Sequence, residues 1–160
     1  MVTFVSTYLK GRKPDEVLSI MKDLKVDVVL DVRWWVVYPL YYNPNIELKP
    51  PLKSFHILLT ENKIEYRYEA LLGNPSELRK KYIDTGNWEQ ARKAYCDWIL
   101  NGVYKDGTEI RPIFNGYISA FKSLWKDKVI CLLCFCPTED SRYCHRYWII
   151  ELFKQYLKSD

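Results

Sequence analysis

The sequence predicts an α/β protein with three layers, in which a mostly parallel, Rossmann-like sheet lies between two layers of helices. Short apolar, β-branched runs alternate along the chain with longer segments whose apolar residues recur every three to four positions. Pro, Gly and Asn separate many of these segments. The chain has 160 residues, 48% of them hydrophobic and 28% charged, so we expect a single domain over residues 1–160.

The N-terminal part predicts two strands, one helix and a long aromatic segment. Residues 2–7 (VTFVST) alternate and are β-branched, which is typical of a strand. A helix follows over 14–24, because Pro14 suits a first helical position and the next two acidic residues suit its positive end. Residues 26–32 (VDVVLDV) form the nearly continuous apolar run of a buried parallel strand. Residues 33–53 have no clean period, and a loop this long usually acts as a lid or binding segment.

The rest of the chain alternates in the same way. The pattern predicts, in order, a short helix over 54–63, a strand over 64–69, a helix entered after Gly73 and Pro75, a helix capped by Asn87, a helix over 112–125, a strand over 128–135 and a terminal helix over 142–158. For the terminal helix we expect Asp140 or Ser141 as N-cap, which places Cys144 and His145 in the first turn.

Charged or reactive residues follow every predicted strand. They are Lys10, Arg12 and Lys13 after the first strand, Asp31 and Arg33 at the end of the second, Glu69 at the end of the third, and the polar residues of CFCPTEDSRYCHR (134–146) after the fourth. Glu69 leads into a turn that contains Gly73. Parallel strands with right-handed crossovers end at one edge of the sheet, where ligands of open α/β sheets bind. The sequence therefore predicts a pocket at this edge.

An anion is the ligand that these residues favour. The free N–H groups at the start of the terminal helix attract negative charge, and Arg33 and Arg146 can each hold a phosphate or carboxylate with two hydrogen bonds. We expect Asp31 and His145 to orient the ligand or to act as base and acid. The predicted ligand is a nucleotide or another phosphorylated small molecule, which the protein either only binds or also hydrolyses or uses in group transfer. A non-enzymatic module that binds nucleic acid or a partner protein is the alternative.

Segment 134–146 contains three of the five cysteines and one of the two histidines, a composition that allows other chemistries. Cys134, Cys136, Cys144 and His145 are ligand types of structural zinc. Their spacing matches no common zinc motif, and neighbouring helical residues such as Cys144 and His145 point about 100° apart, so we predict no metal and no cofactor. A redox pair of Cys134 and Cys136 is disfavoured because we expect the two side chains to face opposite sides of the strand.

A cysteine phosphatase is a further alternative, since Cys136 and Arg142 have the C-x5-R spacing of a phosphate-binding loop. Pro137 supplies no N–H to such a loop, and Glu139 and Asp140 would repel a phosphate dianion. We therefore interpret the spacing as accidental.

The aromatic segment allows two interpretations. Its rings, which are Trp34, Trp35, Tyr38, Tyr41 and Tyr42, can stack on nucleobases or can pack as a lid or as the face of a homodimer. The segment has few basic residues, so we favour packing. A net charge of +4 permits an anionic ligand but is weaker than the basic stripe of a duplex-DNA binder.

The location is predicted to be the cytoplasm, with reduced thiols. There is no run of about 18 apolar residues, as a membrane span requires. The first residues place a basic stretch after an apolar one, the reverse of the order in a signal peptide. The odd number of cysteines does not suggest a disulfide framework.

Several of these residues resemble the pattern of a known family. Asp31-Val32-Arg33 ends the second strand, Ile64-Glu65-Tyr66 precedes Leu72-Gly73, and Leu132-Leu133-Cys134 is followed by Cys144-His145-Arg146. From about residue 2 to 155 the chain resembles the domain of unknown function 488 family (DUF488). The resemblance implies a compact three-layer α/β domain but no settled reaction. The site positions that it implies are Asp31, Arg33, Gly73, Cys134, Cys144, His145 and Arg146.

Two positions depart from that family. Its members often carry a glutamate two residues after the first cysteine, where this chain has Cys136. The stretch after Asp31-Val32-Arg33 usually contains a proline with further basic or small polar residues, whereas here it reads WWVVYPLYY. We therefore expect a pocket that is more apolar than those of its relatives, without a role for the missing glutamate.

Overall fold

The computed structural model describes residues 1–34, 55–83, 85–136, 139–140 and 142–159. Most of the aromatic segment, including Trp35, Tyr38, Tyr41 and Tyr42, lies outside these residues, and so does Ser141. The lid, nucleobase and homodimer interpretations of that segment therefore stay predictions. None of the described helices is long and apolar enough to cross a membrane.

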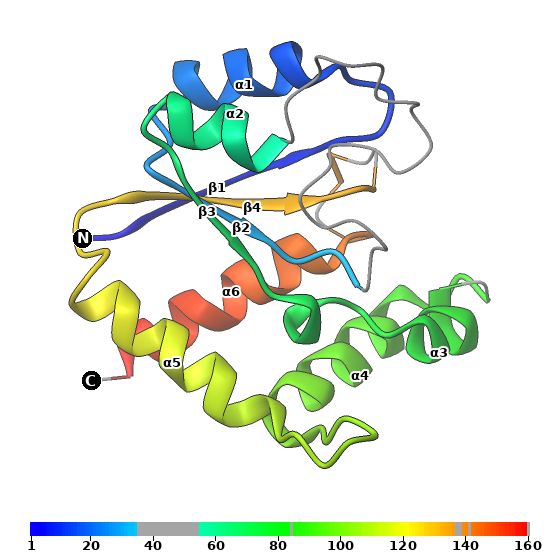
Figure 1. Ribbon diagram of the computed structural model, residues 1–160. Helices are drawn as coiled ribbons and strands as arrows, with labels where there is room; N and C mark the ends of the chain where they lie inside the picture. Colours follow the sequence, from blue (N-terminus) through cyan, green and yellow to red (C-terminus); the bar gives the residue numbers. More distant parts are fainter. Residues whose placement is uncertain (35–54, 84, 137–138, 141, 160) are drawn as a thin grey trace.

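Four parallel strands form one sheet, which confirms the predicted fold class. The strands are β1 (Thr3–Tyr8), β2 (Val28–Asp31), β3 (Glu65–Tyr68) and β4 (Val129–Cys134), in the order β1-β4-β2-β3. The last strand in the sequence, β4, lies between β1 and β2 (Figure 1). Because it is central, β4 is covered on both faces, which explains its continuous apolar composition.

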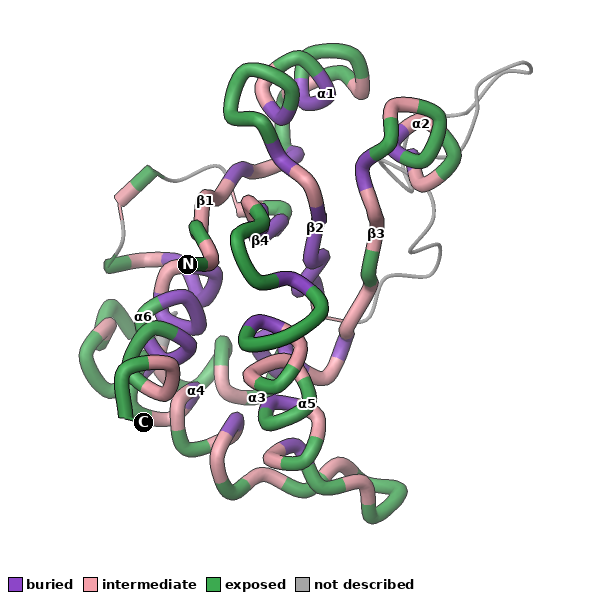
Figure 2. Tube along the Cα trace, turned by 90° about the vertical axis from the view of Figure 1, so that its left-hand side faces the viewer, coloured by how far each residue is buried: buried purple, intermediate pink, exposed green. Residues whose placement is uncertain are grey.

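Helices cover both faces of the sheet (Figures 1 and 2). On one face lie α1 (Pro14–Asp23) and α2 (Phe55–Glu61), and on the other lie α4 (Trp88–Asn101), α5 (Ile110–Lys122) and α6 (His145–Lys158). Three short helical segments connect β3 to α4, namely η1 (Ala70–Leu72), α3 (Ser76–Leu78) and η2 (Arg79–Ile83), of which η2 is π-helical. The described chain is therefore a Rossmann-like α/β protein.

Each face of the sheet has its own apolar core, and β4 contributes to both. Cys131 and Leu133 join the core under α1 and α2, whereas Ile130 and Leu132 join the core under α4, α5 and α6. This alternation follows from the two-residue period of a strand. Cys131 is fully buried in the first core, as a small apolar residue would be.

The start of α6 differs from the prediction. The helix begins at His145 with Cys144 as N-cap, rather than at Arg142. The Asp140 carboxylate instead accepts a hydrogen bond from the Arg142 N–H at 3.0 Å, and the Asp140 carbonyl accepts one from the Tyr143 N–H at 3.1 Å. Side chain–backbone bonds of this kind form a local turn that competes with helix formation. The cap of α4 is as predicted, since Asn87 Oδ1 accepts a hydrogen bond from the Gln90 N–H.

The carboxyl ends of all four strands lie at one edge of the sheet, as expected. Tyr8 is in register with Cys134 across β1 and β4, and Asp31 is in register with Leu133 and Tyr68 on its two neighbours. Residues that follow different strands are thereby brought together at this edge.

Candidate functional site

A hydrogen bond joins the two charged motifs of the sequence. Nε2 of His145, at the start of α6, lies 2.7 Å from the carbonyl oxygen of Val32, which stands between Asp31 and Arg33. A carbonyl can only accept, so Nε2 carries the proton and Nδ1 is left as an acceptor. Burial lowers the pKa of His145 below its ordinary value, which keeps the ring neutral at pH 7. His145 therefore anchors α6 to the end of β2.

Asp31 and Arg33 form a buried ion pair. Arg33 Nε donates to the two carboxylate oxygens of Asp31 at 2.8 and 3.0 Å, and the Tyr66 hydroxyl donates to the same carboxylate at 2.6 Å. Asp31 is fully buried, and Arg33 is nearly so. Burial and the nearby Asp31 raise the pKa of Tyr66, so its hydroxyl stays protonated and remains a donor. Both oxygens of Asp31 are thus committed within the chain, and action as a general base would require this pair to open.

Gly73 has a packing role that sequence reasoning did not identify. A Cβ atom at this position would lie 2.7 Å from the Cα and N atoms of Trp34 and 2.8 Å from the Ala70 carbonyl oxygen. The Trp34 ring packs edge-to-face against the ring of Trp98, with centroids 5.9 Å apart. Gly73 therefore lets the backbone after Arg33 approach closely, and its predicted contact with a ligand stays a prediction.

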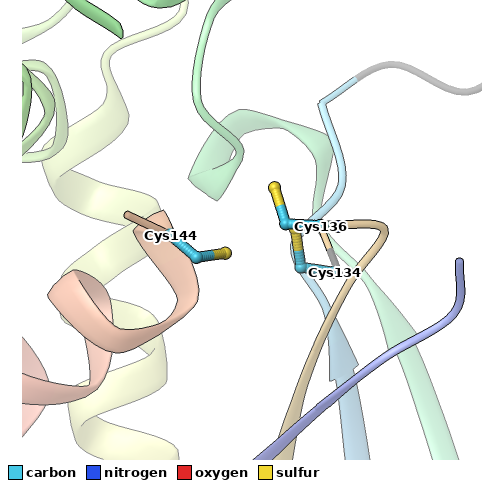
Figure 3. Close-up of side chains that lie close together, drawn as sticks. All are labelled: Cys134, Cys136 and Cys144. Atoms are coloured by element: carbon cyan, nitrogen blue, oxygen red, sulfur yellow. The ribbon is translucent and has the colours of Figure 1, made fainter. Parts of the chain in front are cut away.

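Three cysteine sulfurs come together next to His145. Cys134 ends β4, Cys136 lies two residues further on, and Cys144 caps α6; their Sγ atoms all lie within 4.8 Å of one another (Figure 3). The expectation that Cys134 and Cys136 face apart is wrong, since residues two apart in an extended chain point to the same side. Cys144 has extended backbone angles (φ −133°, ψ 131°), so the helical angle of 100° between Cys144 and His145 does not apply either.

Polar groups surround the three sulfurs of Cys134, Cys136 and Cys144, which together we call the thiol cluster. The Cys136 N–H donates to Cys134 Sγ and Arg146 Nη1 donates to Cys144 Sγ, both at 3.4 Å, and Nδ1 of His145 lies 4.0 Å from Cys134 Sγ. Hydrogen bonds from the Cys136 and Cys144 thiols lower the pKa of Cys134 well below its ordinary value. The same hydrogen bonds to Cys134 raise the pKa of Cys136 and of Cys144. The three thiols therefore share their protons, so that they titrate as one coupled group.

A second polar network surrounds the ring of Tyr8, at the end of β1. The guanidinium carbon of Arg12 lies 3.7 Å from the ring centroid, and that of Arg146 lies 5.7 Å from it. Arg146 Nη2 donates to the Tyr147 hydroxyl at 3.1 Å, which in turn donates to Glu139 Oε2 at 3.2 Å. The other oxygen of Glu139 lies 3.7 Å from Arg12 Nη2. Glu139 thus bridges two cationic side chains that come from different elements.

The contacts of Arg142 do not favour the phosphatase alternative. Its guanidinium binds the Asp140 carboxylate at 3.0 and 3.1 Å through Nε, and both side chains are exposed. Hydrogen bonds from Arg142 lower the pKa of Asp140 to about 2. In this structure the Arg142 guanidinium therefore binds Asp140, which is not the arrangement of a phosphate clamp over Cys136.

A surface hollow of about 420 Å³ lies between α4 and α6, apart from these groups. Its lining includes Arg92, Cys96, Trp148 and Lys154 but none of the predicted site residues. It therefore does not bear on the pocket predicted at the carboxyl edge of the sheet.

A family model, described as domain of unknown function DUF488, matches residues 13–153. The chain belongs to the DUF488 family. The matched region contains both Asp31-Val32-Arg33 and Cys144-His145-Arg146, the two motifs of this DUF488 protein that the bond between His145 and Val32 joins. No curated protein and no solved structure matches the chain.

The structure brings six of the seven predicted positions into two groups, together with some unpredicted residues. Cys134 and Cys144 belong to the thiol cluster, which His145 and Arg146 contact, while Arg33 pairs with Asp31. Sequence reasoning did not single out Tyr8 or Tyr66. It placed Arg12 at this edge and considered Cys136 as a zinc ligand, but it kept neither as a site residue. For Tyr66 the sequence does contain a signal. A buried tyrosine hydroxyl needs a hydrogen-bond partner, and the strand before it in the chain ends in Asp31. The role of Tyr8 depends on strand order, for which the sequence carries no signal.

Proposed function

We propose that the carboxyl edge of the sheet binds an anionic, phosphorylated small molecule such as a nucleotide, with Arg12 as the cation that contacts it. The observation that carries the proposal is the approach of two guanidinium groups, those of Arg12 and Arg146, to the single ring of Tyr8. Like charges repel, so this arrangement favours an anion nearby. Glu139 takes that role within the chain.

An external phosphate can replace Glu139 beside Arg12. The distance of 3.7 Å is long for an ion pair, and the Glu139 side chain is 68% exposed, so this interaction is weak. The Arg12 side chain is 24% exposed and is anchored to Thr7 Oγ1 at 2.7 Å, which holds the guanidinium in place for a ligand. A phosphate can form two charge-assisted hydrogen bonds to such a group.

Two further features support an anion at this edge. The helix α6 has 14 residues, and its N-terminus, which carries positive partial charge, includes Arg146 as the second residue. Arg146 is fully buried, so it adds positive charge from behind the site rather than a contact. In this proposal Arg12 takes the role that the sequence favoured for Arg33, whose guanidinium holds Asp31.

Hydrolysis or group transfer on the ligand is the enzymatic form of the proposal. Nδ1 of the neutral His145 is an acceptor and is the candidate base. The alternative is a non-enzymatic module that binds nucleic acid or a partner protein. It differs in its ligand, so one binding experiment separates the two.

A thermal-melt panel tests the proposal. Reduced protein is melted with inorganic phosphate, with common nucleotides and with a short single strand. A ligand at about one hundred times its dissociation constant adds about 2.7 kcal/mol, which raises the Tm of a chain of this size by about 5–11 °C. We expect one nucleotide to produce such a rise.

Two substitutions locate the ligand. Arg12→Gln should abolish the rise, and Glu139→Gln should increase it because a competing carboxylate is removed. Arg111→Gln is the matched control. Arg111 also lies over a tyrosine ring, that of Tyr156, but it is on α5 and is not one of the residues of the proposed site, so the rise should be unchanged. A nucleotide shift that is unchanged in Arg12→Gln would refute the site. A rise with the single strand alone that falls steeply with salt would favour the non-enzymatic alternative.

A further inference from the structure

The thiol cluster has nearly the dimensions of a tetrahedral metal site. With zinc–sulfur bonds of about 2.3 Å, the sulfurs of such a site lie about 3.8 Å apart. The Sγ atoms of Cys134, Cys136 and Cys144 are already within 4.8 Å of one another. A shift of each sulfur by well under 1 Å therefore closes the cluster around an ion. These residues lie on a strand end, a loop and a helix cap, so their approach is a product of the fold.

His145 is oriented as a metal ligand would be. A histidine that binds a metal through one ring nitrogen usually donates the other N–H to a carbonyl or carboxylate, which fixes its tautomer and its plane. Here Nε2 donates to the Val32 carbonyl at 2.7 Å, and Nδ1, an acceptor, lies 4.0 Å from Cys134 Sγ. The ring lies outside the group of three sulfurs that are all within 4.8 Å of one another, so it must move closer to Cys136 or Cys144 to complete the set. The corresponding sulfur–nitrogen distance in a tetrahedral zinc site is about 3.6 Å.

The surroundings of the cluster balance the charge of a bound ion. Three thiolates, a neutral imidazole and a divalent cation sum to one negative charge. The Arg146 guanidinium, which donates to Cys144 Sγ at 3.4 Å, supplies one positive charge, and the Cys136 N–H donates to Cys134 Sγ at the same distance. Because buried charges are stable only when paired and hydrogen-bonded, this neutral set suits a buried site.

We propose that Cys134, Cys136 and Cys144 bind a Zn²⁺ ion, with Nδ1 of His145 as the fourth ligand. Thiolate and imidazole ligands in a tetrahedral set select zinc over the hard cations Mg²⁺ and Ca²⁺. Cys134, Cys144 and His145 are buried, as in the closed sites of structural zinc, whereas Cys136 is half-buried and offers a path of entry. The ion ties the loop after β4 to the start of α6.

The binding step involves no electron transfer. Each thiol that becomes a ligand releases its proton to solvent, so loading one ion frees up to three protons and forms three zinc–sulfur bonds. The inference goes beyond the proposed function. Anion binding depends on the contact cation Arg12 and its competitor Glu139, neither of which is a zinc ligand, so the failure of either proposal leaves the other intact. The enzymatic form with Nδ1 of His145 as base is a separate matter, because one lone pair cannot bind zinc and accept a proton at the same time.

A disulfide within the cluster is the competing use of these cysteines. It employs two sulfurs and assigns no role to the third or to the orientation of His145. Zinc employs all four groups, which is why the geometry favours it.

Titration with Co²⁺ tests the proposal, since this ion adopts the same geometry and absorbs visible light. The protein is reduced, freed of metal with a chelator and titrated anaerobically. We expect saturation at one equivalent per chain, with the intense visible absorption of tetrahedral cobalt and a thiolate-to-cobalt charge-transfer band. Zn²⁺ should then bleach both signals.

Substitutions and thiol protection identify the ligands. Cys134→Ser, Cys136→Ser and Cys144→Ser should each weaken binding by more than the about 10–100-fold expected when a group outside the ligand set is changed. Cys96→Ser is the matched control, since Cys96 is a half-buried cysteine on α4, and it should bind as the unchanged protein does. In the unchanged protein, zinc should protect the same three cysteines, but not Cys96, from alkylation, which gives a test even where a variant does not fold.

Three results would overturn the inference. The first is a weak spectrum of octahedral cobalt or no saturation at one equivalent. The second is alkylation of the cluster at the same rate with and without zinc. The third is reduced protein that takes up no cobalt but forms a disulfide within the cluster on exposure to air. A cobalt spectrum in His145→Gln that is identical to that of the unchanged protein would remove His145 from the ligand set.

Discussion

Asp31→Asn separates a structural role of Asp31 from a catalytic one. The substitution keeps the size of the side chain but removes its charge, at a position where Arg33 and Tyr66 donate to both oxygens. Arg33 is 4% exposed, so its positive charge would be left buried without its counter-ion. An amide also turns an N–H₂ group toward one of these donors, which costs a further hydrogen bond.

The expected loss is large. Removing one partner of a buried ion pair costs about 3–5 kcal/mol, a substantial part of the about 5–15 kcal/mol by which native proteins are stable. For a chain of about 150–250 residues each kcal/mol corresponds to about 2–4 °C, so the Tm should fall by about 6–20 °C. The double variant Asp31→Asn/Arg33→Met should recover part of the loss, because it also removes the stranded charge.

Urea unfolding followed by tryptophan fluorescence measures this loss as a shift of the midpoint at constant slope. Asp140→Asn is the matched control. Asp140 pairs with Arg142 two residues further on, with nearly the same geometry but on the surface, so we expect no resolvable change. If Asp31→Asn were as stable as the unchanged protein, the ion pair would not hold the end of β2. That result would favour the predicted catalytic role of Asp31 over a structural one.

Three other outcomes are expected. Tyr66→Phe removes the 2.6 Å hydrogen bond to the buried carboxylate and should cost about 1.5–3 kcal/mol in urea unfolding, so an unchanged midpoint would speak against that bond. Gly73→Ala should cost about 1–3 kcal/mol because its Cβ meets backbone at 2.7 Å, whereas Gly116→Ala, in open space on α5, should stabilise by about 0.5–1 kcal/mol; equal effects would contradict the packing. Burial raises the pKa of Cys131 to about 12, so an alkylating reagent at pH 9 should leave it unlabelled in folded protein, and rapid labelling without unfolding would show that it is accessible.

The layered fold could be predicted from the sequence because strands buried on both faces are continuous apolar runs. The predicted strand over 128–135 contains β4, and the predicted strand over 26–32 contains the shorter β2. The start of α6 could not be predicted in the same way. Asp140 is a good N-cap residue, but its carboxylate binds the Arg142 backbone and side chain in a turn of its own.

The edge of the sheet could be predicted, but the partners at that edge could not. Parallel strands bring their carboxyl ends together in any order. The position of β4 beside β1 puts Tyr8 next to Cys134, and the neighbouring β3 supplies Tyr66 to Asp31. These pairings depend on strand order, which is set by tertiary packing. The residues of the thiol cluster were considered as zinc ligands and rejected, because their spacing along the chain matches no common zinc motif and does not show that the loop after β4 returns to the cap of α6.

Zinc-edge X-ray absorption of protein loaded with one equivalent of Zn²⁺ tests the assignment of the thiol cluster most directly. We expect three sulfur neighbours at about 2.3 Å and one nitrogen at about 2.0–2.1 Å. The sulfur shell should shrink in Cys136→Ser and stay unchanged in Cys96→Ser. A first shell of oxygen and nitrogen alone, or one with the same sulfur content in both variants, would contradict a zinc site built by Cys134, Cys136 and Cys144.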